Sequence, residues 1–291
     1  MERIAGDLPG ALIGTASAQS MPTEYNGSLA KEQANMRMTG NTILITGGGT
    51  GIGRGLAEAF HKEGNQVVIS GRRLDRLEAT VAANPGMKAE ALDIASGESI
   101  QSFAEQIKQK YPGLNVVIHN AGIMKLEALE KGEVADAEAI IATNLLGPIR
   151  LTAALLPWLV TKPDGVIMAV SSGLAFVPLS MTPTYCATKA AIHSYAQSLR
   201  YQLRQTPVQV IELIPPYVQT ELMGARQASD PNAMPLREFV SETMQILKKS
   251  PDTAEVCVER VVPLRRAEAN GNYEAFVRQF NERAASSHTE L

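Results

Sequence analysis

Hydrophobic residues between Asn41 and Pro215 come in short runs that alternate with longer amphipathic stretches. Strands that alternate with helices in this way are typical of βαβ units, in which helices cover both faces of a parallel sheet. We therefore expect an α/β fold with a doubly wound parallel sheet, whose ligands bind beyond the carboxyl ends of the strands. The short runs predict strands at Thr42–Thr46, Gln66–Ser70, Lys88–Asp93, Asn115–His119, Gly165–Ser171 and Val208–Leu213. The amphipathic stretches predict helices at Ile52–Glu63, Leu74–Ala83, Ser99–Lys110, Glu133–Val160 and Thr184–Gln205.

The pattern changes after Pro215. Tyr217–Pro235 is rich in Met, Gly and Pro, and Leu236–Lys249 predicts a helix. A segment of this kind suits a lid over a small-molecule pocket at about residues 217–250; the alternative is a surface excursion without a role. The remainder, residues 250–291, predicts mostly helix and no seventh strand. Residues 38–291 are expected to form a single domain.

Residues 1–37 contain an uncharged stretch rich in Gly, Ala and Ser. Ala16-Ser17-Ala18 resembles a signal-peptidase site, but the apolar stretch before it is short and is interrupted by a proline and a glycine. We therefore expect a disordered extension in preference to an export signal. The longest uncharged stretch, Gly165–Thr188, also contains prolines, so no membrane span is predicted there.

Composition narrows the partners further. The chain has 27 Lys and Arg against 30 Asp and Glu, a net charge of −3. Nucleic-acid-binding domains usually have a pI above about 9, so nucleic acid is not an expected partner. Cys186 and Cys257 are far apart, and the four histidines lack metal-ligand spacing. Neither a disulfide framework nor a metal site is expected, and the reducing cytoplasm is the expected location.

A glycine-rich loop directly follows the first predicted strand and reads Thr46-Gly47-Gly48-Gly49-Thr50-Gly51-Ile52-Gly53. Glycines permit a tight turn and let the backbone approach a pyrophosphate, whose charge is met by free N–H groups and the positive end of the helix. The loop lacks the Gly-Lys-Ser/Thr ending of a P-loop, which disfavours ATP or GTP hydrolysis. Its place between a strand and a helix predicts a dinucleotide site.

Two arginines follow the second predicted strand. An NAD site usually has an acidic residue here for the ribose 2′-hydroxyl, but the chain reads Ser70-Gly71-Arg72-Arg73. A guanidinium can form charge-assisted bonds to a 2′-phosphate, which favours NADP over NAD. Arg72 is the first choice for this contact and Arg73 the second; the alternative is that both are solvated at a helix start.

Tyr185 and Lys189 lie four residues apart where a helix is predicted, so both occupy one helix face. A nearby cation favours phenolate, so the pKa of the phenol should fall toward working pH, where it can exchange a proton with a substrate alcohol or carbonyl. Ser172 ends the fifth predicted strand, and its hydroxyl can stabilise the substrate oxygen. Ser171 is the weaker candidate, because neighbouring strand residues point to opposite faces.

Together, these motifs resemble those of the short-chain dehydrogenase/reductase family, in its compact single-domain branch. The resemblance covers about residues 38–225. Its motifs are Thr46-Gly47-x-x-x-Gly51-x-Gly53, Asp93, Asn120-Ala121-Gly122, Asn144, Ser172, Tyr185-x-x-x-Lys189 and Pro215–Thr220. The resemblance implies a Rossmann-type oxidoreductase that transfers hydride between a nicotinamide and a substrate carbon, with NADP(H) preferred and NAD(H) as the alternative.

The resemblance also implies residue roles. Tyr185 would be the general acid/base, Ser172 would polarise the substrate oxygen, and Lys189 would lower the pKa of Tyr185 and hold the nicotinamide ribose. Asn144 would support a water that links Lys189 to solvent. Asp93 would meet the adenine, and Thr220 the carboxamide. The implied cofactor-binding residues are Gly47, Thr50, Gly51, Ile52, Gly53, Arg72, Arg73, Asp93, Asn120, Ala121, Gly122, Tyr185, Lys189, Pro215 and Thr220.

Besides the missing seventh strand, the chain departs from the family pattern at two points. His119 stands where the family commonly has Asn, and we expect it to pack under the loop without binding a ligand. Pro215-Pro216 stands where Pro-Gly is usual, and the second proline ring stiffens the backbone beside the nicotinamide.

The residues expected around the substrate are mainly apolar, with no Arg or Lys placed to bind a carboxylate or phosphate. They are Met124, Leu174–Met181, Tyr217, Leu222 and Met223. This predicts a neutral, fairly hydrophobic aldehyde, ketone or secondary alcohol. Cys186 is expected to be a packing residue without a redox role.

The long helices at Glu133–Val160 and Thr184–Gln205 are apolar over more than one stripe, which suggests burial against another subunit. The residues concerned include Leu145, Leu146, Leu155, Leu156, Ile192 and Leu199. The family resemblance implies a homodimer or homotetramer; the alternative is that these helices only cover the sheet. Two functional alternatives also stay open, an NAD-linked alcohol dehydrogenase and a nucleotide-sensing regulator. A regulator has no need for the complete set of Ser172, Tyr185 and Lys189.

Overall fold

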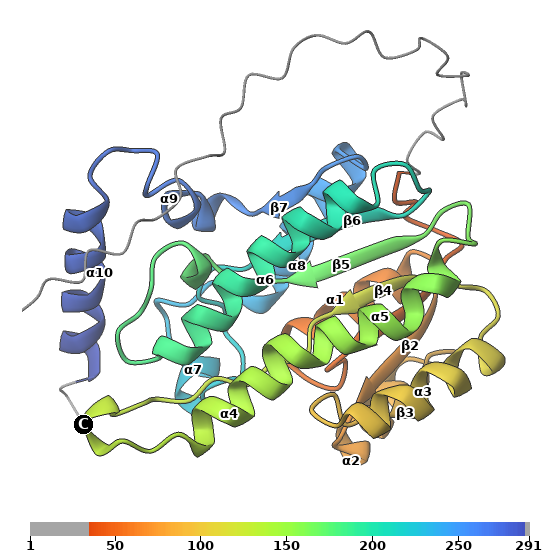
Figure 1. Cartoon of the computed structure of the whole chain (residues 1–291), viewed down its shortest axis with the longest axis horizontal. Helices are drawn as coiled ribbons and strands as arrows, with labels where there is room; N and C mark the ends of the chain where they lie inside the picture. The colour runs from red at the N-terminus through yellow and green to blue at the C-terminus, as the bar shows by residue number, and fades with distance from the viewer. Residues whose placement is uncertain (1–34, 289–291) are drawn as a thin grey trace, which may run out of the picture. The chain divides into compact units, whose positions relative to one another are not determined.

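In a computed structural model that describes residues 35–288, seven parallel strands form one sheet in the order β3-β2-β1-β4-β5-β6-β7 (Figure 1). The chain divides into two units, Met1–Ala30 and Lys31–Leu291, and all described residues belong to the second. The strands are β1 (Thr42–Thr46), β2 (Gln66–Gly71), β3 (Lys88–Ala91), β4 (Leu114–His119), β5 (Val166–Val170), β6 (Gln209–Ile214) and β7 (Glu255–Cys257). The strand order reverses between β1 and β4, which is where a doubly wound sheet opens a crevice for its ligand.

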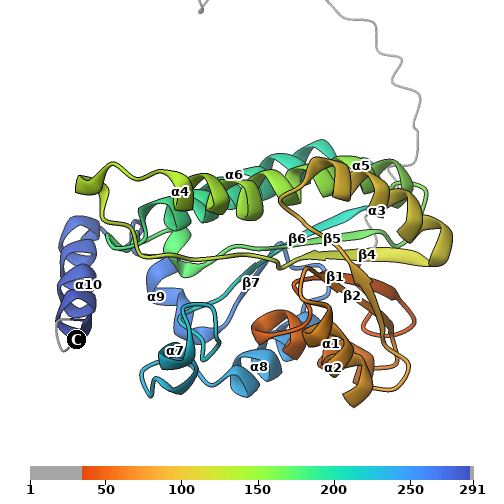
Figure 2. The same cartoon turned by 90° about the horizontal axis from the view of Figure 1, so that it is seen from below.

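Helices cover both faces of this sheet (Figure 2). One face carries α3 (Gly97–Lys110), α4 (Ala135–Ile141), α5 (Gly147–Leu159) and α6 (Pro183–Gln202). The opposite face carries α1 (Gly51–Lys62), α2 (Leu74–Ala83), α7 (Ala225–Ser229) and α8 (Leu236–Lys249). Successive residues of a strand therefore enter different cores. Ile43 shares a core with Phe60 of α1, whereas Leu44 belongs to the core that includes Leu151 of α5.

The predicted doubly wound α/β fold is confirmed. Five predicted strands differ from the observed ones only by one or two residues at their ends, and β1 and α2 have the predicted bounds. The helix predicted at Glu133–Val160 is interrupted, because Ala142–Leu146 forms a π-helix between α4 and α5. This turn carries Asn144, one of the predicted site residues.

The prediction of no seventh strand is wrong. Glu255–Cys257 forms β7, which pairs in parallel with Glu212–Ile214 of β6. The strand is three residues long, lies at the sheet edge and begins with a charged residue, so it has neither the length nor the alternation that marks a strand in a sequence. A short helix, α9 (Val262–Arg265), and a longer one, α10 (Tyr273–His288), follow it.

Three further predictions concern the N-terminal boundary, a possible membrane span and the segment at 217–250. Met36 is 2% exposed and packs in a core, so ordered packing begins earlier than the predicted boundary at residue 38. Of residues 1–37, for which a disordered extension is predicted, residues 1–34 lie outside the described residues. Among the described residues, one helical stretch, Ala135–Leu159, has the length and apolar composition of a membrane span, and it packs on the sheet. The lid role of residues 217–250 stays a prediction; a bridge from Val218 to Met234 closes the first part of this segment.

Candidate active site

The glycine loop turns sharply between β1 and α1. Gly47 and Gly51 have φ values of +68° and +53°, a region that favours glycine. A Cβ on Gly53 would lie 2.3 Å from Asn120 Nδ2 and 2.4 Å from the carbonyl oxygen of Gly47. The loop therefore requires glycine for two separate reasons, backbone conformation and close approach.

Residues after β4 hold this loop in place. The Asn120 side chain donates to the carbonyl oxygens of Thr46 (2.9 Å) and Gly47 (3.3 Å). The Thr46 hydroxyl oxygen accepts from the backbone N–H groups of Asn120 (3.0 Å) and Ala121 (3.1 Å). Thr220 comes from beyond β6 and lies beside Gly51, since a Cβ there would be 3.4 Å from Thr220 Cβ. Segments predicted separately as cofactor contacts are thus brought together.

The start of α1 suits a phosphate. Thr50 caps the helix in an extended conformation without a side-chain hydrogen bond to the first N–H groups, and the first turn has no acidic residue. These N–H groups and the positive end of the helix attract an anion. Because the backbone is also open to close approach at its glycines, the residues present fit the pyrophosphate of a nicotinamide dinucleotide.

The two predicted arginines lie at the end of β2. Arg73 donates a hydrogen bond from its guanidinium to the Thr50 hydroxyl at 3.3 Å, which places this positive charge beside the loop. Arg72 is exposed. The order of preference between Arg72 and Arg73 stays a prediction.

Ser172 and Tyr185 meet as predicted. Ser172 follows β5 and Tyr185 lies in the first turn of α6, with the Ser172 hydroxyl near enough to the phenol to favour its phenolate form. Both are nearly buried, with exposed fractions of 8% and 7%. Ser171 instead donates its hydroxyl to Glu212 Oε1 at 2.5 Å, on the side facing α6, so the choice of Ser172 over Ser171 agrees with the geometry.

Lys189 lies on the same face of α6 as Tyr185, with its Nζ 5.5 Å from the centroid of the tyrosine ring. The ammonium donates to the carbonyl oxygen of Val170 at 2.8 Å. Burial lowers the pKa of Lys189 to about 8, while the charge of Glu212 acts in the opposite direction. This side chain can therefore lose its charge in mildly alkaline solution.

The expected lowering of the Tyr185 pKa is wrong for this chain. Burial raises the pKa of the Tyr185 phenol above its ordinary value, and the nearby Ser172 hydroxyl offsets only part of this effect. The physical reason is that the phenol lies in a cluster with Ile140 and Cys186, against which Met124, Leu174 and Leu179 pack, and an apolar environment disfavours phenolate.

Asn144 occupies the middle of the π-helix between α4 and α5. Its side chain forms two hydrogen bonds with the backbone of Ile123, accepting at 2.9 Å and donating at 2.8 Å. It also lies 3.4 Å from the Thr188 hydroxyl of α6. Asn144 thereby ties the segment after β4 to the helix that carries Tyr185. The water predicted to bind here stays a prediction.

The remaining predicted residues have simple surroundings. Asp93 follows β3 and accepts from Ala95 N–H at 3.1 Å, and the Pro215 carbonyl accepts from Gly173 N–H at 2.9 Å. Ile52 packs against a core of the sheet.

Burial lowers the pKa of His119 to about 4, and this neutral ring contacts the Thr152 hydroxyl at 2.9 Å, as expected for a packing residue. Cys186 is 4% exposed and accepts from Leu179 N–H, which also agrees with packing.

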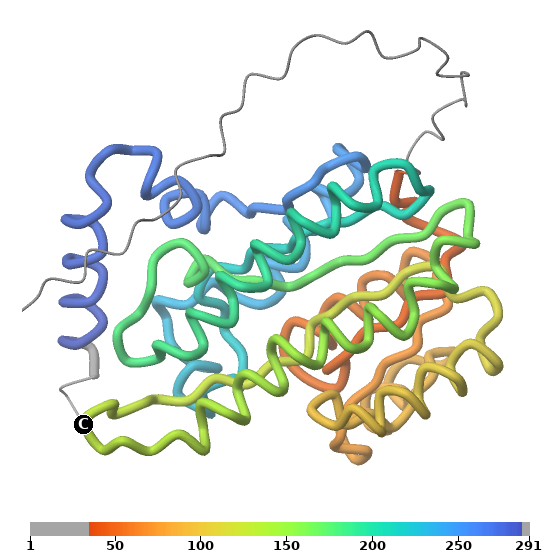
Figure 3. Tube along the Cα trace, viewed as in Figure 1, coloured from red at the N-terminus to blue at the C-terminus, as the bar shows by residue number. Residues whose placement is uncertain are grey.

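The loop that connects Ser172 to Tyr185 is anchored by α10. Asn281 accepts from Ser180 N–H at 2.6 Å and donates to the Pro178 carbonyl at 3.0 Å. Tyr273 donates its hydroxyl proton to the Phe176 carbonyl at 2.9 Å. Figure 3 shows α10 (dark blue) standing beside this loop, although the two are about a hundred residues apart in sequence. The last described helix thus packs against the segment that joins Ser172 to Tyr185.

Comparison with known proteins decides the family. A family model described as short chain dehydrogenase matches residues 41–231, which is more than half of the chain. The chain belongs to the short-chain dehydrogenase family. Residues 41–231 include all the motifs of the glycine loop and of Ser172, Tyr185 and Lys189. The predicted recognition is therefore confirmed, and the protein is an oxidoreductase.

A curated relative supports this membership, and two solved structures share the fold. The uncharacterized oxidoreductase DltE of Bacillus subtilis is 39% identical over 254 residues, which cover 84% of this chain and 98% of DltE. A 3-ketoacyl-(acyl-carrier-protein) reductase from Brucella melitensis, complexed with NADH, is 25% identical with a TM-score of 0.70, covering 78% of this chain and 100% of that one. A short-chain dehydrogenase from Sphingobium yanoikuyae, in complex with NADPH, is 24% identical with a TM-score of 0.69, covering 81% and 94%.

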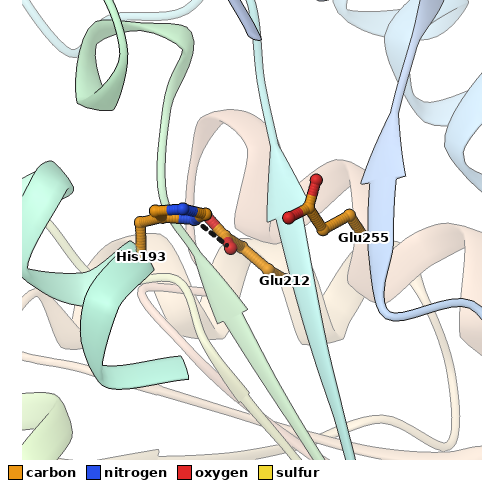
Figure 4. A group of neighbouring side chains, drawn as sticks. All are labelled: His193, Glu212 and Glu255. Carbon is orange, nitrogen blue, oxygen red and sulfur yellow. Dashed lines mark hydrogen bonds and ion pairs between the residues drawn. The ribbon is translucent and has the colours of Figure 1, made fainter. Parts of the chain in front are cut away.

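Sequence reasoning missed a second group of polar side chains behind the dehydrogenase site. Glu212 of β6 accepts from Ser171 and contacts His193 of α6, and Glu255 of β7 lies near both (Figure 4). The available signal was Glu212 itself, the one acidic residue in the apolar run Val208–Ile214, because a charge in a buried strand needs a partner. Gln227 was also missed; it donates to the Thr220 hydroxyl at 3.0 Å and holds this cofactor-side residue.

Proposed function

We propose that the dehydrogenase reduces neutral, fairly hydrophobic aldehydes and ketones with NADPH, and oxidises the corresponding alcohols in reverse, with Tyr185 as the general acid and base. The observation that carries this proposal is the buried Tyr185 phenol, which lies in an apolar cluster with Ser172 near its hydroxyl and Lys189 on the same helix face. A phenol in this setting can transfer a proton to or from a substrate oxygen.

Each side chain has a distinct role in the proposed reduction. Tyr185 donates its phenolic proton to the substrate oxygen, and Ser172 donates a hydrogen bond to that oxygen as negative charge develops. Because burial raises the pKa of Tyr185, the phenol stays protonated at neutral pH, which supports the reductive direction. Lys189 is proposed to hold the nicotinamide ribose. A nicotinamide bound here supplies the hydride that reduces the carbonyl carbon.

NADPH is expected to bind more tightly than NADH. Arg72 and Arg73 supply two positive charges at the end of β2, and Arg73 is fixed beside the glycine loop through Thr50. Replacing either arginine by glutamate is expected to lower the preference for NADPH by roughly 10- to 150-fold, as charge-assisted hydrogen bonds to a 2′-phosphate are lost. Nicotinamide fluorescence in parallel titrations measures both affinities. Tighter NADH binding by the unchanged protein would overturn the NADP preference and leave the enzyme class intact.

The proposed substrate class rests on the apolar surroundings of Tyr185. Met124, Leu174 and Leu179 pack against its cluster, and none of these can pair with a carboxylate. Neutral aromatic and aliphatic carbonyls are therefore expected to have a higher kcat/KM than small keto acids of similar size. A panel of both, assayed with the preferred cofactor, tests this; faster turnover of keto acids contradicts it.

We also propose that the protein is a cytoplasmic homodimer or homotetramer. Leu155 and Leu199, expected at a subunit interface, belong to the core of the sheet, so they do not support it. Support comes instead from Leu129, Ile141 and Leu145, which line an apolar hollow beside the start of α6. Light scattering of the purified protein tests this assembly, and a monomeric mass contradicts it.

The proposed cytoplasmic location agrees with the free thiols of Cys186 and Cys257, which suit a reducing compartment. Cell fractionation tests this location.

A further inference from the structure

A fully buried carboxylate lies directly behind the proposed catalytic residues. Glu212 is 0% exposed and stands within β6, opposite Ala169 of β5. Both of its oxygens are engaged: Oε1 accepts from the Ser171 hydroxyl at 2.5 Å, and Oε2 lies 2.7 Å from His193 Nδ1 (Figure 4). The carboxylate is therefore held at both oxygens inside the sheet.

Burying such a charge is costly unless an opposite charge lies nearby. His193 contacts the carboxylate directly, and Lys189 adds its charge from the same face of α6, on which Tyr185, Lys189 and His193 follow one another at intervals of four residues. The Lys189 ammonium is itself buried, at 5% exposure, and its hydrogen bond goes to a neutral carbonyl. The charge of Glu212 acts on Lys189 and favours its protonated form.

The other ionisable groups around Glu212 also have partners of their own. Glu255 of β7 forms a two-point ion pair with Arg265, at 2.8 and 2.9 Å. Arg200 of α6 donates to the backbone carbonyls of Val210 and Ala254. His193 also contacts Gln197, at 3.1 Å. Although His193, Glu212 and Glu255 bring ligand atoms within 4.8 Å of one another, Arg265 already occupies both oxygens of Glu255. The group is therefore better explained as a charge network than as a metal site.

We propose that Glu212 is a positioning residue for Lys189: fixed by Ser171 and His193, its carboxylate supplies the negative charge that keeps the buried Lys189 ammonium protonated and in place. This inference rests on the proposed role of Lys189 in holding the nicotinamide ribose. It assigns Glu212, with Ser171 and His193 that hold it, an indirect function in cofactor binding that acts through Lys189 and does not involve Glu255.

The test is the dissociation constant of NADPH between pH 7 and 10, or of NADH should that bind more tightly, in full-length protein. In the unchanged protein, affinity is expected to fall above about pH 8, where Lys189 loses its proton. In Glu212→Gln this fall is expected to begin about one pH unit lower, because the opposite charge is gone, so that affinity at pH 8 drops about fivefold. Glu212→Asp keeps the negative charge but places it farther from Lys189, because the side chain is shorter. Its curve should lie between those of the unchanged protein and Glu212→Gln.

Glu255→Gln is the matched control, since it neutralises a neighbouring carboxylate of the same cluster. Its pH curve is expected to coincide with that of the unchanged protein. Cooperative unfolding establishes that each variant is folded, and Glu212→Asp serves as the test should Glu212→Gln not fold. An unmoved curve in the folded Glu212 variants, or an equal displacement in Glu255→Gln, overturns the inference. Lys189→Met separates the two proposals: if its curve keeps the pH dependence of the unchanged protein, the role of Lys189 itself is wrong.

Discussion

Replacing Tyr185 with phenylalanine is expected to lower kcat by about 10²- to 10⁴-fold, the usual contribution of a positioned general acid. The variant loses only the hydroxyl, while the ring keeps its place beside Ile140 and Cys186. Cofactor affinity should therefore stay within a few-fold of the original value. Steady-state turnover of a neutral carbonyl, together with a cofactor titration, measures both quantities.

Tyr201→Phe provides the control for this experiment. Tyr201 lies near the end of the same helix, α6, but is 68% exposed and far from Ser172 in sequence. Its loss should leave turnover unchanged. Turnover near the original value in Tyr185→Phe would refute the role of Tyr185 as proton donor, whatever the cofactor preference is found to be.

Replacing Gly53 with alanine is expected to weaken cofactor binding by at least about tenfold and to destabilise the fold by about 1–3 kcal/mol, the usual cost of overpacking. The new methyl group would lie 2.4 Å from the Gly47 carbonyl oxygen, a backbone atom that cannot move without opening the loop. It would also displace the Asn120 side chain, which holds the loop through Thr46 and Gly47. A cofactor titration and chemical denaturation measure the two effects.

Gly97→Ala is the matched change at the start of another helix, α3. The nearest atoms to the new methyl group belong to the Arg150 side chain, at 4.0 Å, so alanine is accommodated there. Because alanine favours helix more than glycine does, stability should be equal or slightly higher. Normal cofactor affinity in Gly53→Ala would show that the loop does not contact the cofactor closely.

The sequence predicts the parts of the site that local patterns encode. The glycine loop is contiguous, and Tyr185 and Lys189 are spaced by one helical turn, so both features can be recognised without knowing the fold. The order of βαβ units then places these motifs at the same edge of the sheet. Asn120 and Ser172 come directly after strands that end at this edge, and Asn144 contacts the segment after β4, so all three lie near these motifs.

Features that depend on distant residues were not predictable in the same way. The edge strand β7 has too few residues to show a pattern, and its identity depends on pairing with β6. The π-helix at Asn144 interrupts a stretch whose composition indicates continuous helix. The effect of burial on the pKa of Tyr185 depends on side chains from several elements, including Met124 and Leu179, which no local spacing reveals.

The anchoring of the substrate-side loop by α10 has a consequence for the order of folding. Ser180 and Asn281 are 101 residues apart, so the loop beside Tyr185 acquires this contact only after nearly the whole described chain has left the ribosome. The glycine loop and Asn120, which holds it, by contrast, belong to the segment from β1 to residue 120 and can form while synthesis continues. During synthesis, the glycine loop is therefore expected to take its shape before the loop beside Tyr185 is anchored.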